Sequence, residues 1–241
     1  MVKIISFAII KLMKYSIKLL IITIASLLLM SNLAISDEVK GNNEFIELPL
    51  ISVDSSEKFV SLQQAMKKRR SVRAFSDKSL DLEQLGQLLW SAQGITDLKG
   101  KRSVPSPGGL YPLEVYAVTG SGVYKYIPLG HKLELLQTDD LRVDLSAAAF
   151  SQLAVAEAGA DIVICAVYER VTKQFGDRGV RFVHIEAGHA GQNIHLQAVG
   201  LGLGSISIGA FDDSSVKKLL SLPDEQQPVY IIPVGYRKLN I

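Results

Sequence analysis

The stretch from Val180 to Val199 constrains the fold of this chain more than any other segment. It is long enough for a helix of about five turns, it is apolar on several faces, and it contains Gly188 and Gly191. A helix that has to bury most of its circumference belongs either in a protein core or in an interface between subunits. The rest of the chain must therefore enclose this helix or pair it with a second copy.

The other segments alternate short helices with short strands. Asp81–Gln93 is the clearest helix, because it has a leucine stripe, a cap at Ser79 or Asp81, and Gly94 at its end. Residues 95–112 are rich in Gly, Pro and Ser and are expected to form a loop. Apolar periodicity predicts further helices over 61–68, 145–158 and 212–220, and strands over 115–119, 123–127, 161–168, 205–208 and 229–234. This mixed order predicts one α+β domain.

The first 36 residues have the composition of an export leader. They contain no acid and four lysines, Lys3, Lys11, Lys14 and Lys18. An apolar core, Leu19–Met30, precedes the small residues Ala34 and Ser36. These features are typical of a secretory signal peptide, and Leu19–Ile35 is also close to the length of a membrane anchor. We therefore expect an exported protein.

The leader sets the predicted organisation and location of the chain. Residues 1–36 are expected to be a signal peptide or membrane anchor, and residues 37–58 are expected to be a linker. The protein would be periplasmic, or attached through residues 4–35 to the outer face of the inner membrane. The four leader lysines also explain the net charge of +2, because the remaining 22 basic and 24 acidic residues give −2. A nucleic-acid partner is therefore not predicted.

Two short segments could carry chemistry. Arg69-Arg70-Ser71-Val72-Arg73 places three guanidinium groups and a hydroxyl within five residues, a pattern that suits phosphate because arginine offers planar pairs of donors. The alternative is a solvated basic helix end that complements the helix dipole. In the second segment, Pro105–Pro112, adjacent glycines allow the backbone to approach a flat ligand, although such a loop can also be a simple turn.

Other motifs do not support a function of their own. Gly200-Leu201-Gly202-Leu203-Gly204 looks like a dinucleotide loop, but it follows a helix and precedes a strand, which inverts the fingerprint. His184 and His189 are about 140° apart around a helix, so with Glu186 and His195 they are not expected to converge on a metal. The single cysteine, Cys165, excludes a disulfide framework and is expected to pack as a small apolar residue.

Taken in order, these segments resemble the FMN-dependent nitroreductase superfamily, specifically its SagB/ThcOx-type dehydrogenase branch. The matching stretches are RRSVRAF (69–75), PSPGGLYPLEVY (105–116), HKLELL (131–136), RFVHIEAGHAGQNIHLQAVGLGLG (181–204) and IGAFDD (208–213). The resemblance implies an α+β nitroreductase-like fold, with a central mixed and mainly antiparallel sheet flanked by helices. It also implies a homodimer in which two chains share two flavin sites, with residues 59–241 as the FMN domain.

The resemblance implies roles for the matching positions. The FMN phosphate and the pyrimidine side of the flavin would contact Arg69, Arg70, Ser71 and Arg73. The isoalloxazine would be approached by a loop of the partner chain that contains Pro105, Ser106, Gly108, Gly109 and Leu110. The backbone near flavin N5 would be that of Ile208 and Gly209, and a second phosphate contact would come from Arg237. The helix over 181–199 would then be a dimer interface.

One departure from the branch bears on the reaction. Its azoline-oxidising members resemble one another in a Lys-Tyr pair before a Gly-x-Arg segment, where this chain has Gln174 and Phe175. Phe175 lacks a hydroxyl and cannot act as a general acid or base, and Lys173 could substitute only through a one-residue shift. The departure favours a stand-alone reductase over thiazoline or oxazoline oxidation.

The resemblance therefore favours an exported FMN-dependent oxidoreductase that passes hydride through flavin N5 to a small-molecule acceptor. NAD(P)H is the electron donor of cytoplasmic relatives and a candidate donor here. One alternative is a flavin- or nucleotide-binding protein without turnover, and another is an azoline-type peptide dehydrogenase. No side chain is assigned as catalytic, and no metal is expected.

Overall fold

The computed structural model describes residues 44–51 and 60–238. The predicted leader and parts of the predicted linker lie outside these residues. The centre of the described part is a seven-stranded sheet with the order β1-β4-β3-β2-β5-β7-β6, in which every pair of neighbouring strands is antiparallel. The strands are β1 (Phe45–Glu47), β2 (Leu113–Thr119), β3 (Gly122–Ile127), β4 (Lys132–Gln137), β5 (Ala160–Ala166), β6 (Gly204–Ser205) and β7 (Gln227–Gly235).

The sheet separates two apolar cores. Because successive side chains of a strand point to opposite faces, β2 sends Val115 and Ala117 into one core and Tyr116 and Val118 into the other. The neighbouring strand β5 is buried along its whole length. Cys165 belongs to this strand and packs in the second core as a small apolar residue, which confirms the prediction for it.

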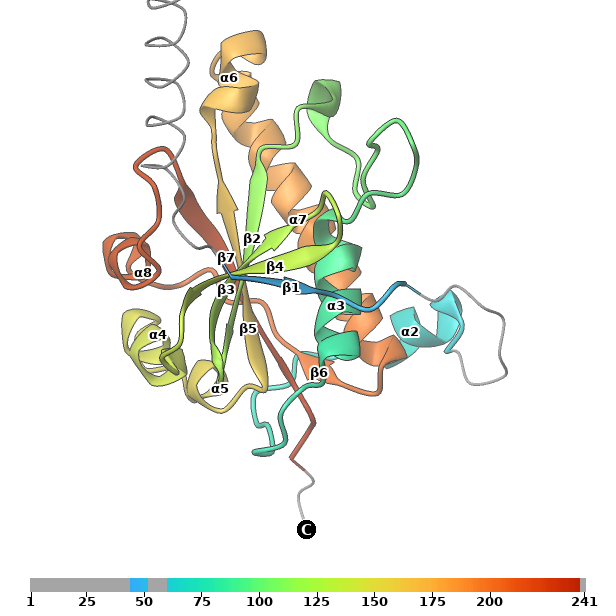
Figure 1. Ribbon diagram of the computed structural model, residues 1–241, viewed down its shortest axis with the longest axis vertical. Coiled ribbons are helices and arrows are strands. Elements are labelled where there is room, and N and C mark those ends of the chain that lie inside the picture. The colour runs from blue at the N-terminus through green and yellow to red at the C-terminus, as the bar shows by residue number, and fades with distance from the viewer. Residues whose placement is uncertain (1–43, 52–59, 239–241) are drawn as a thin grey trace, which may run out of the picture. The chain divides into compact units, whose positions relative to one another are not determined.

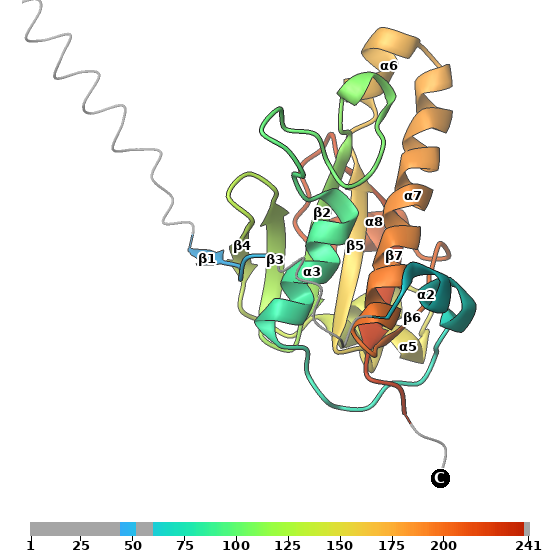
Figure 2. The same ribbon diagram turned by 90° about the vertical axis from the view of Figure 1, so that its right-hand side faces the viewer.

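Helices cover both faces of the sheet. On one face lie α3 (Leu82–Gln93) and α7 (Arg178–Gly200), with α2 (Leu62–Lys68) packed on α7 (Figure 1). On the other face lie α4 (Arg142–Ala148), α5 (Leu153–Ala156) and α8 (Asp213–Leu219), and α6 (Glu169–Phe175) leads into α7 at one end of the sheet (Figure 2). The two-layer cover and the antiparallel sheet confirm the predicted α+β fold.

The long helix α7 buries one side and leaves the other exposed. Its buried side, which includes Val183, Ala187 and Ile194, packs on α3 and the sheet. Val180 and Ile185 on the opposite side are 42% and 49% exposed. The residues that the structure describes therefore do not bury most of the helix circumference, and Val180 and Ile185 stay available for contact with another molecule.

Several elements differ from the sequence prediction. The helix expected over 145–158 is divided into α4 and α5, because Phe150 and Ser151 adopt left-handed backbone angles of φ 55° and 59°. Strand β4 and helix α6 were not predicted at all, and β1 lies in the segment expected to be a linker. The hairpin of β2 and β3 and the helices α2, α3, α7 and α8 are confirmed.

The predicted localisation needs correction. Within residues 44–51 and 60–238, no helix combines the length and the apolar character needed to cross a membrane. The longest, α7, has 23 residues but carries Arg178, Arg181 and Glu186, and charged side chains are costly at the centre of a bilayer. The prediction of a protein that is exported, periplasmic or anchored on the outer face of the inner membrane therefore has no support in the described residues, and it is withdrawn.

Candidate functional site

The arginine segment that follows α2 lies against the sheet edge at β6. Ser71 forms a parallel bridge with Ser205, and the Val72 N–H donates a 3.0 Å hydrogen bond to the Ser205 carbonyl. A Cβ atom on Gly204 would lie 2.7 Å from Val72 Cγ2, so only glycine permits this close approach. The glycine at the end of the predicted turn therefore brings the arginines to the sheet.

The end of β7 completes the same edge. Arg237 pairs with Phe75, and the Lys238 N–H donates a 3.1 Å hydrogen bond to the Ala74 carbonyl. Ile208 exchanges two backbone hydrogen bonds with Ile231, of 2.8 and 3.0 Å. Three of the predicted site segments, around Arg69, Ile208 and Arg237, are thus neighbours on one side of the fold.

The glycine-rich loop lies elsewhere. Its 3-10 turn η1 (Pro107–Gly109) is close to α6, since a Cβ on Gly108 would lie 3.3 Å from Gln174 Oε1 and 3.5 Å from Phe175 Cε2. Both views place this loop near the N-terminal end of α7, whereas α2 lies towards its C-terminal end (Figures 1 and 2). One chain therefore does not bring the loop to the arginine segment.

The arginines of the site are not neutralised. In residues 44–51 and 60–238, no ion pair involves any of the four predicted arginines, Arg69, Arg70, Arg73 and Arg237. A hollow at the end of α7 is lined by Lys67, Lys68, Arg70 and Arg237 together with Val60 and the turn 199–203, and its lining contains no acid. This edge of the molecule is suited to binding an anion.

Arg70 also has a structural role. Its Nη1 donates to the carbonyls of Lys67 and Arg69, at 3.1 and 2.6 Å, and so caps the last turn of α2. The alternative interpretation of the segment as a basic helix end therefore holds for Arg70. Ser71 does not belong to this helix end, because it forms the bridge to Ser205 on the sheet.

A buried polar cluster supports the glycine-rich loop. Arg102 donates from Nη1 to Gln93 Oε1 at 2.7 Å, and Gln93 Nε2 donates to Glu186 Oε1 at 3.4 Å. Glu186 is 1% exposed, and its Oε2 atom has no hydrogen-bond partner in the part of the chain that the structure describes. Burial raises the pKa of the Glu186 carboxyl, while Ser106 and Gln93 oppose the shift by hydrogen bonding. The chain of contacts joins α3 and α7 to the loop at Ser106.

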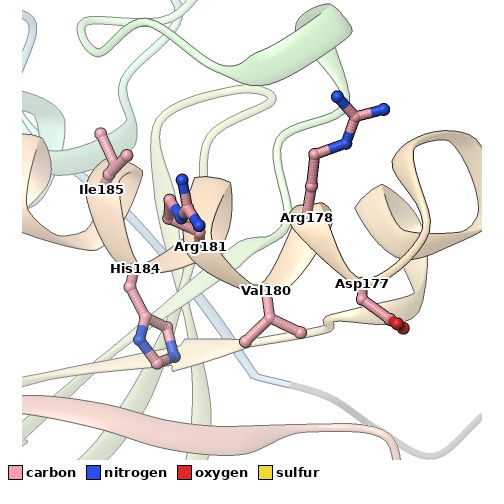
Figure 3. A pocket seen from close by; sticks show the side chains of 6 residues that line it. All are labelled: Asp177, Arg178, Val180, Arg181, His184 and Ile185. Atoms are coloured by element: carbon pink, nitrogen blue, oxygen red, sulfur yellow. The ribbon is translucent and has the colours of Figure 1, made fainter.

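His184 and His189, which were not expected to converge on a metal, have separate surroundings in the structure. His184 Nε2 lies 2.6 Å from the Tyr168 hydroxyl, and His189 is exposed on α7. His184 lines a shallow hollow on the first turns of α7 with Asp177, Arg178, Val180, Arg181 and Ile185 (Figure 3). None of the predicted site residues lines this hollow.

His195 is a candidate site residue that the sequence motifs did not predict. Its Nδ1 atom lies 2.7 Å from Ser205 Oγ, and its Nε2 atom lies 2.5 Å from Ser207 Oγ. Burial and the positive charge of Arg69 lower the pKa of His195 to about 4, so the ring is neutral near pH 7. No sequence motif signals this contact, because it forms only when the turn 200–204 folds the chain back.

Comparison with known proteins identifies the family. The model of the nitroreductase family matches residues 66–236. This chain belongs to the nitroreductase family. A protein of Methanocaldococcus jannaschii named as a nitroreductase is 41% identical over 206 residues, which cover 83% of this chain and 100% of that protein. Membership of this family makes the chain an oxidoreductase.

Two further proteins are similar to this nitroreductase-family chain. A crystal structure of a nitroreductase from Ralstonia eutropha has a TM-score of 0.73 and 27% identity, covering 84% of this chain and 93% of that one. The Microcin B17-processing protein McbC of Escherichia coli is 30% identical over 163 residues, covering 61% of this chain and 59% of that protein. The superfamily and its SagB-type branch, predicted from the motifs, are therefore confirmed.

The residues present fit the flavin that this family typically uses. The edge at β6 offers arginines that form no ion pair with a carboxylate of the described residues, as a phosphate requires. Open glycine backbone is available for a flat ring, because a Cβ on Gly209 would meet no atom closer than 3.9 Å, and one on Gly188 would meet none within 4 Å. The donor set and the open backbone both suit FMN.

Proposed function

We propose that this chain is an FMN-dependent oxidoreductase whose flavin site lies along the edge formed by residues 69–73, 205–209 and 237. The observation that carries the proposal is that the segments of Arg69, Arg73 and Arg237 are neighbours at this edge, and that none of these arginines forms an ion pair within the described residues. When bound, FMN supplies two-electron hydride chemistry at N5, which can connect a donor such as NAD(P)H to a small-molecule acceptor.

Different residues of the edge would bind different parts of FMN. Arg69, Ser71 and Arg73 would hold the phosphate and the pyrimidine side, with Arg70 and Arg237 contributing from the neighbouring hollow. The backbone of Ile208 and Gly209 would face the reacting side of the ring. Positive charge close to the N1–O2 edge would favour the anionic reduced flavin.

A second copy of the chain would complete the site. The loop with Pro105, Ser106, Gly108, Gly109 and Leu110 lies near the opposite end of α7 from the arginines, so we propose that it reaches the flavin of its partner. Family members are commonly dimers, and α2 and α7 present the exposed apolar residues that an interface needs. These are Leu62, Met66, Val180 and Ile185.

The structure gives little support to an azoline-type peptide dehydrogenase. Phe175 packs edge-to-face on Phe182, with ring centroids 5.4 Å apart, and has no hydroxyl to offer. Lys173 is exposed and pairs with Glu169 at 3.1 Å, which directs its ammonium along the surface of α6. The similarity to McbC is the observation that keeps this function as a second candidate.

A spectrum of the purified protein tests the proposal. The full chain should show flavin absorbance, heat should release FMN into the supernatant, and anaerobic addition of NAD(P)H or another two-electron donor should bleach the bound flavin. A colourless protein that takes up no FMN would refute the proposal. A yellow protein that no such donor bleaches would instead be a flavin-binding protein without turnover.

Matched arginine variants locate the site. Arg69→Gln and Arg73→Gln should each weaken FMN binding by roughly tenfold or more, the value of one charge-assisted hydrogen bond. Lys218→Gln removes an exposed positive charge from α8, on the other face of the sheet, and it should leave FMN affinity unchanged. Equal losses in all three variants would point to a nonspecific charge effect.

A further inference from the structure

Three side chains to which no motif gave a role form a hydrogen-bonded row beside the arginine segment 69–73. His195 lies between Ser205 and Ser207, with contacts of 2.7 Å at Nδ1 and 2.5 Å at Nε2. His195 and Ser205 are buried, whereas Ser207 is half-buried. In this serine–histidine row, Ser207 is therefore the member with the greatest access to a ligand.

The row has one free hydrogen-bond donor. A neutral imidazole has one N–H and one acceptor nitrogen, so one serine donates to the ring and the other accepts from it. When the proton is on Nε2, Ser205 donates to Nδ1 and Nε2 donates to Ser207 Oγ. The hydroxyl hydrogen of Ser207 is then free to point away from the ring.

We propose that the Ser207 hydroxyl donates a hydrogen bond to the phosphate of FMN, and that His195 is the positioning residue that orients it. This inference rests on the proposed flavin site and adds a contact that the arginine motif does not contain. An anion at Ser207 selects the Nε2–H tautomer, because each hydrogen bond in such a chain polarises the next. Ser205 is buried on the Nδ1 side of the His195 ring and is the last member of this series of hydrogen bonds.

The position of Arg69 favours an anionic ligand at this point. Its charge acts on the His195 ring, and it has no carboxylate partner in the part of the chain that the structure describes. The bridge between Ser71 and Ser205 links the arginine segment directly to the row. A phosphate group placed there would receive a guanidinium and a hydroxyl, and it would meet no negative charge from the row.

Flavins with and without a phosphate test the contact. In the full chain, Ser207→Ala should lower the affinity for FMN by roughly tenfold and leave the affinity for riboflavin within about twofold, as measured by quenching of flavin fluorescence. Ser121→Ala, in the exposed turn between β2 and β3, is the matched control and should change neither affinity.

Variants of the histidine separate positioning from simple packing. His195→Gln keeps one donor and one acceptor and should retain most of the FMN affinity, whereas His195→Leu should lose as much as Ser207→Ala. Proton NMR of the flavin-free wild type gives a second readout. Inorganic phosphate should raise the pKa of His195 because it offsets the charge of Arg69, and Arg69→Gln should raise that pKa without phosphate.

The outcomes distinguish this inference from the proposed function. If Ser207→Ala weakens FMN and riboflavin equally, or if inorganic phosphate leaves the His195 pKa unchanged while the wild type binds FMN, the phosphate contact is wrong and the flavin site stands. If the wild type binds no FMN but its His195 responds to inorganic phosphate, the flavin site is wrong and an anion site at Ser207 stands.

Discussion

Asp161 is a buried acid, and neither of its carboxylate oxygens has a hydrogen-bond partner among the described residues. Burial raises its pKa well above the usual value, and the charge of nearby Arg142 opposes this shift. The folded chain therefore holds the Asp161 proton more tightly than the unfolded chain. For such a group, stability falls as pH rises from the unfolded pKa near 4 towards the folded pKa.

Replacing this acid by an amide should flatten the pH dependence of stability. In Asp161→Asn, the free energy of unfolding measured by urea titration should fall less between about pH 5 and about pH 8 than in the wild type. Asp77→Asn changes an exposed carboxyl and is the control. Identical slopes in Asp161→Asn and the wild type would show that Asp161 does not titrate in this range.

Glu186 is the second buried acid, and its surroundings are polar. Glu186→Leu removes the acceptor for Gln93 Nε2 and should cost about 1–3 kcal/mol of stability, the usual penalty for an unsatisfied buried group. Glu186→Gln keeps an acceptor and should stay within about 1 kcal/mol of the wild type. Urea unfolding of the two variants checks the difference. A loss of similar size in both variants would mean that the negative charge itself is required.

Residue identity could predict only part of this site. The arginines and glycines were found because they recur as short motifs, and the structure places Arg69, Ile208 and Arg237 together. The partner of Ser207 is twelve residues away at His195, and the two meet only through tertiary folding. A side chain that hydrogen-bonds across a turn leaves no periodic signal in the sequence.

At the scale of elements, prediction succeeded where start and stop signals are local. Asp81 and Gly94 bound α3 as expected, because Asp81 accepts from the Gln84 N–H and Gly94 ends the helix. Strand β4 was missed because its sequence, KLELLQ, has good helix formers. Its pairing with β3 and β1 overrides that propensity.

The contact between β6 and the arginine segment depends on one glycine. Gly204→Ala would place a Cβ within 2.9 Å of three Val72 side-chain atoms and should lower the free energy of unfolding by about 1–3 kcal/mol. It should also weaken FMN binding, because the arginines would move away from Ser205. Thermal unfolding and flavin titration measure the two effects.

Gly200→Ala is the matched control for this prediction. Gly200 ends α7, and a Cβ there would meet nothing within 4 Å. Alanine should be neutral or should stabilise the helix by up to about 1 kcal/mol. If Gly204→Ala behaved like Gly200→Ala, the close approach of Val72 would not be needed for the fold.

For the whole molecule, the decisive feature is that the arginines and the glycine-rich loop lie near opposite ends of α7 (Figure 2). A site that needs both can form only between two chains, and the exposed apolar residues of α7 suit a symmetric contact. Each flavin site would then take its arginines from one subunit and its loop from the other, so a chain with a defect in one segment could still supply the other segment to its partner. This arrangement predicts complementation between damaged chains.

Mixing two variants that bind flavin poorly should therefore restore part of the flavin binding. Arg69→Gln damages the phosphate side, and Gly109→Ala forces a side chain into a left-handed backbone of φ 66° in the loop. After the two are unfolded together and refolded, half of the dimers should be mixed, and each mixed dimer should hold one intact site. Flavin content should then recover to about a quarter of the wild-type value. At an FMN concentration well below the weakened dissociation constants, either variant refolded alone should bind little flavin. Mixed dimers without flavin would show that both segments serve the site of their own chain.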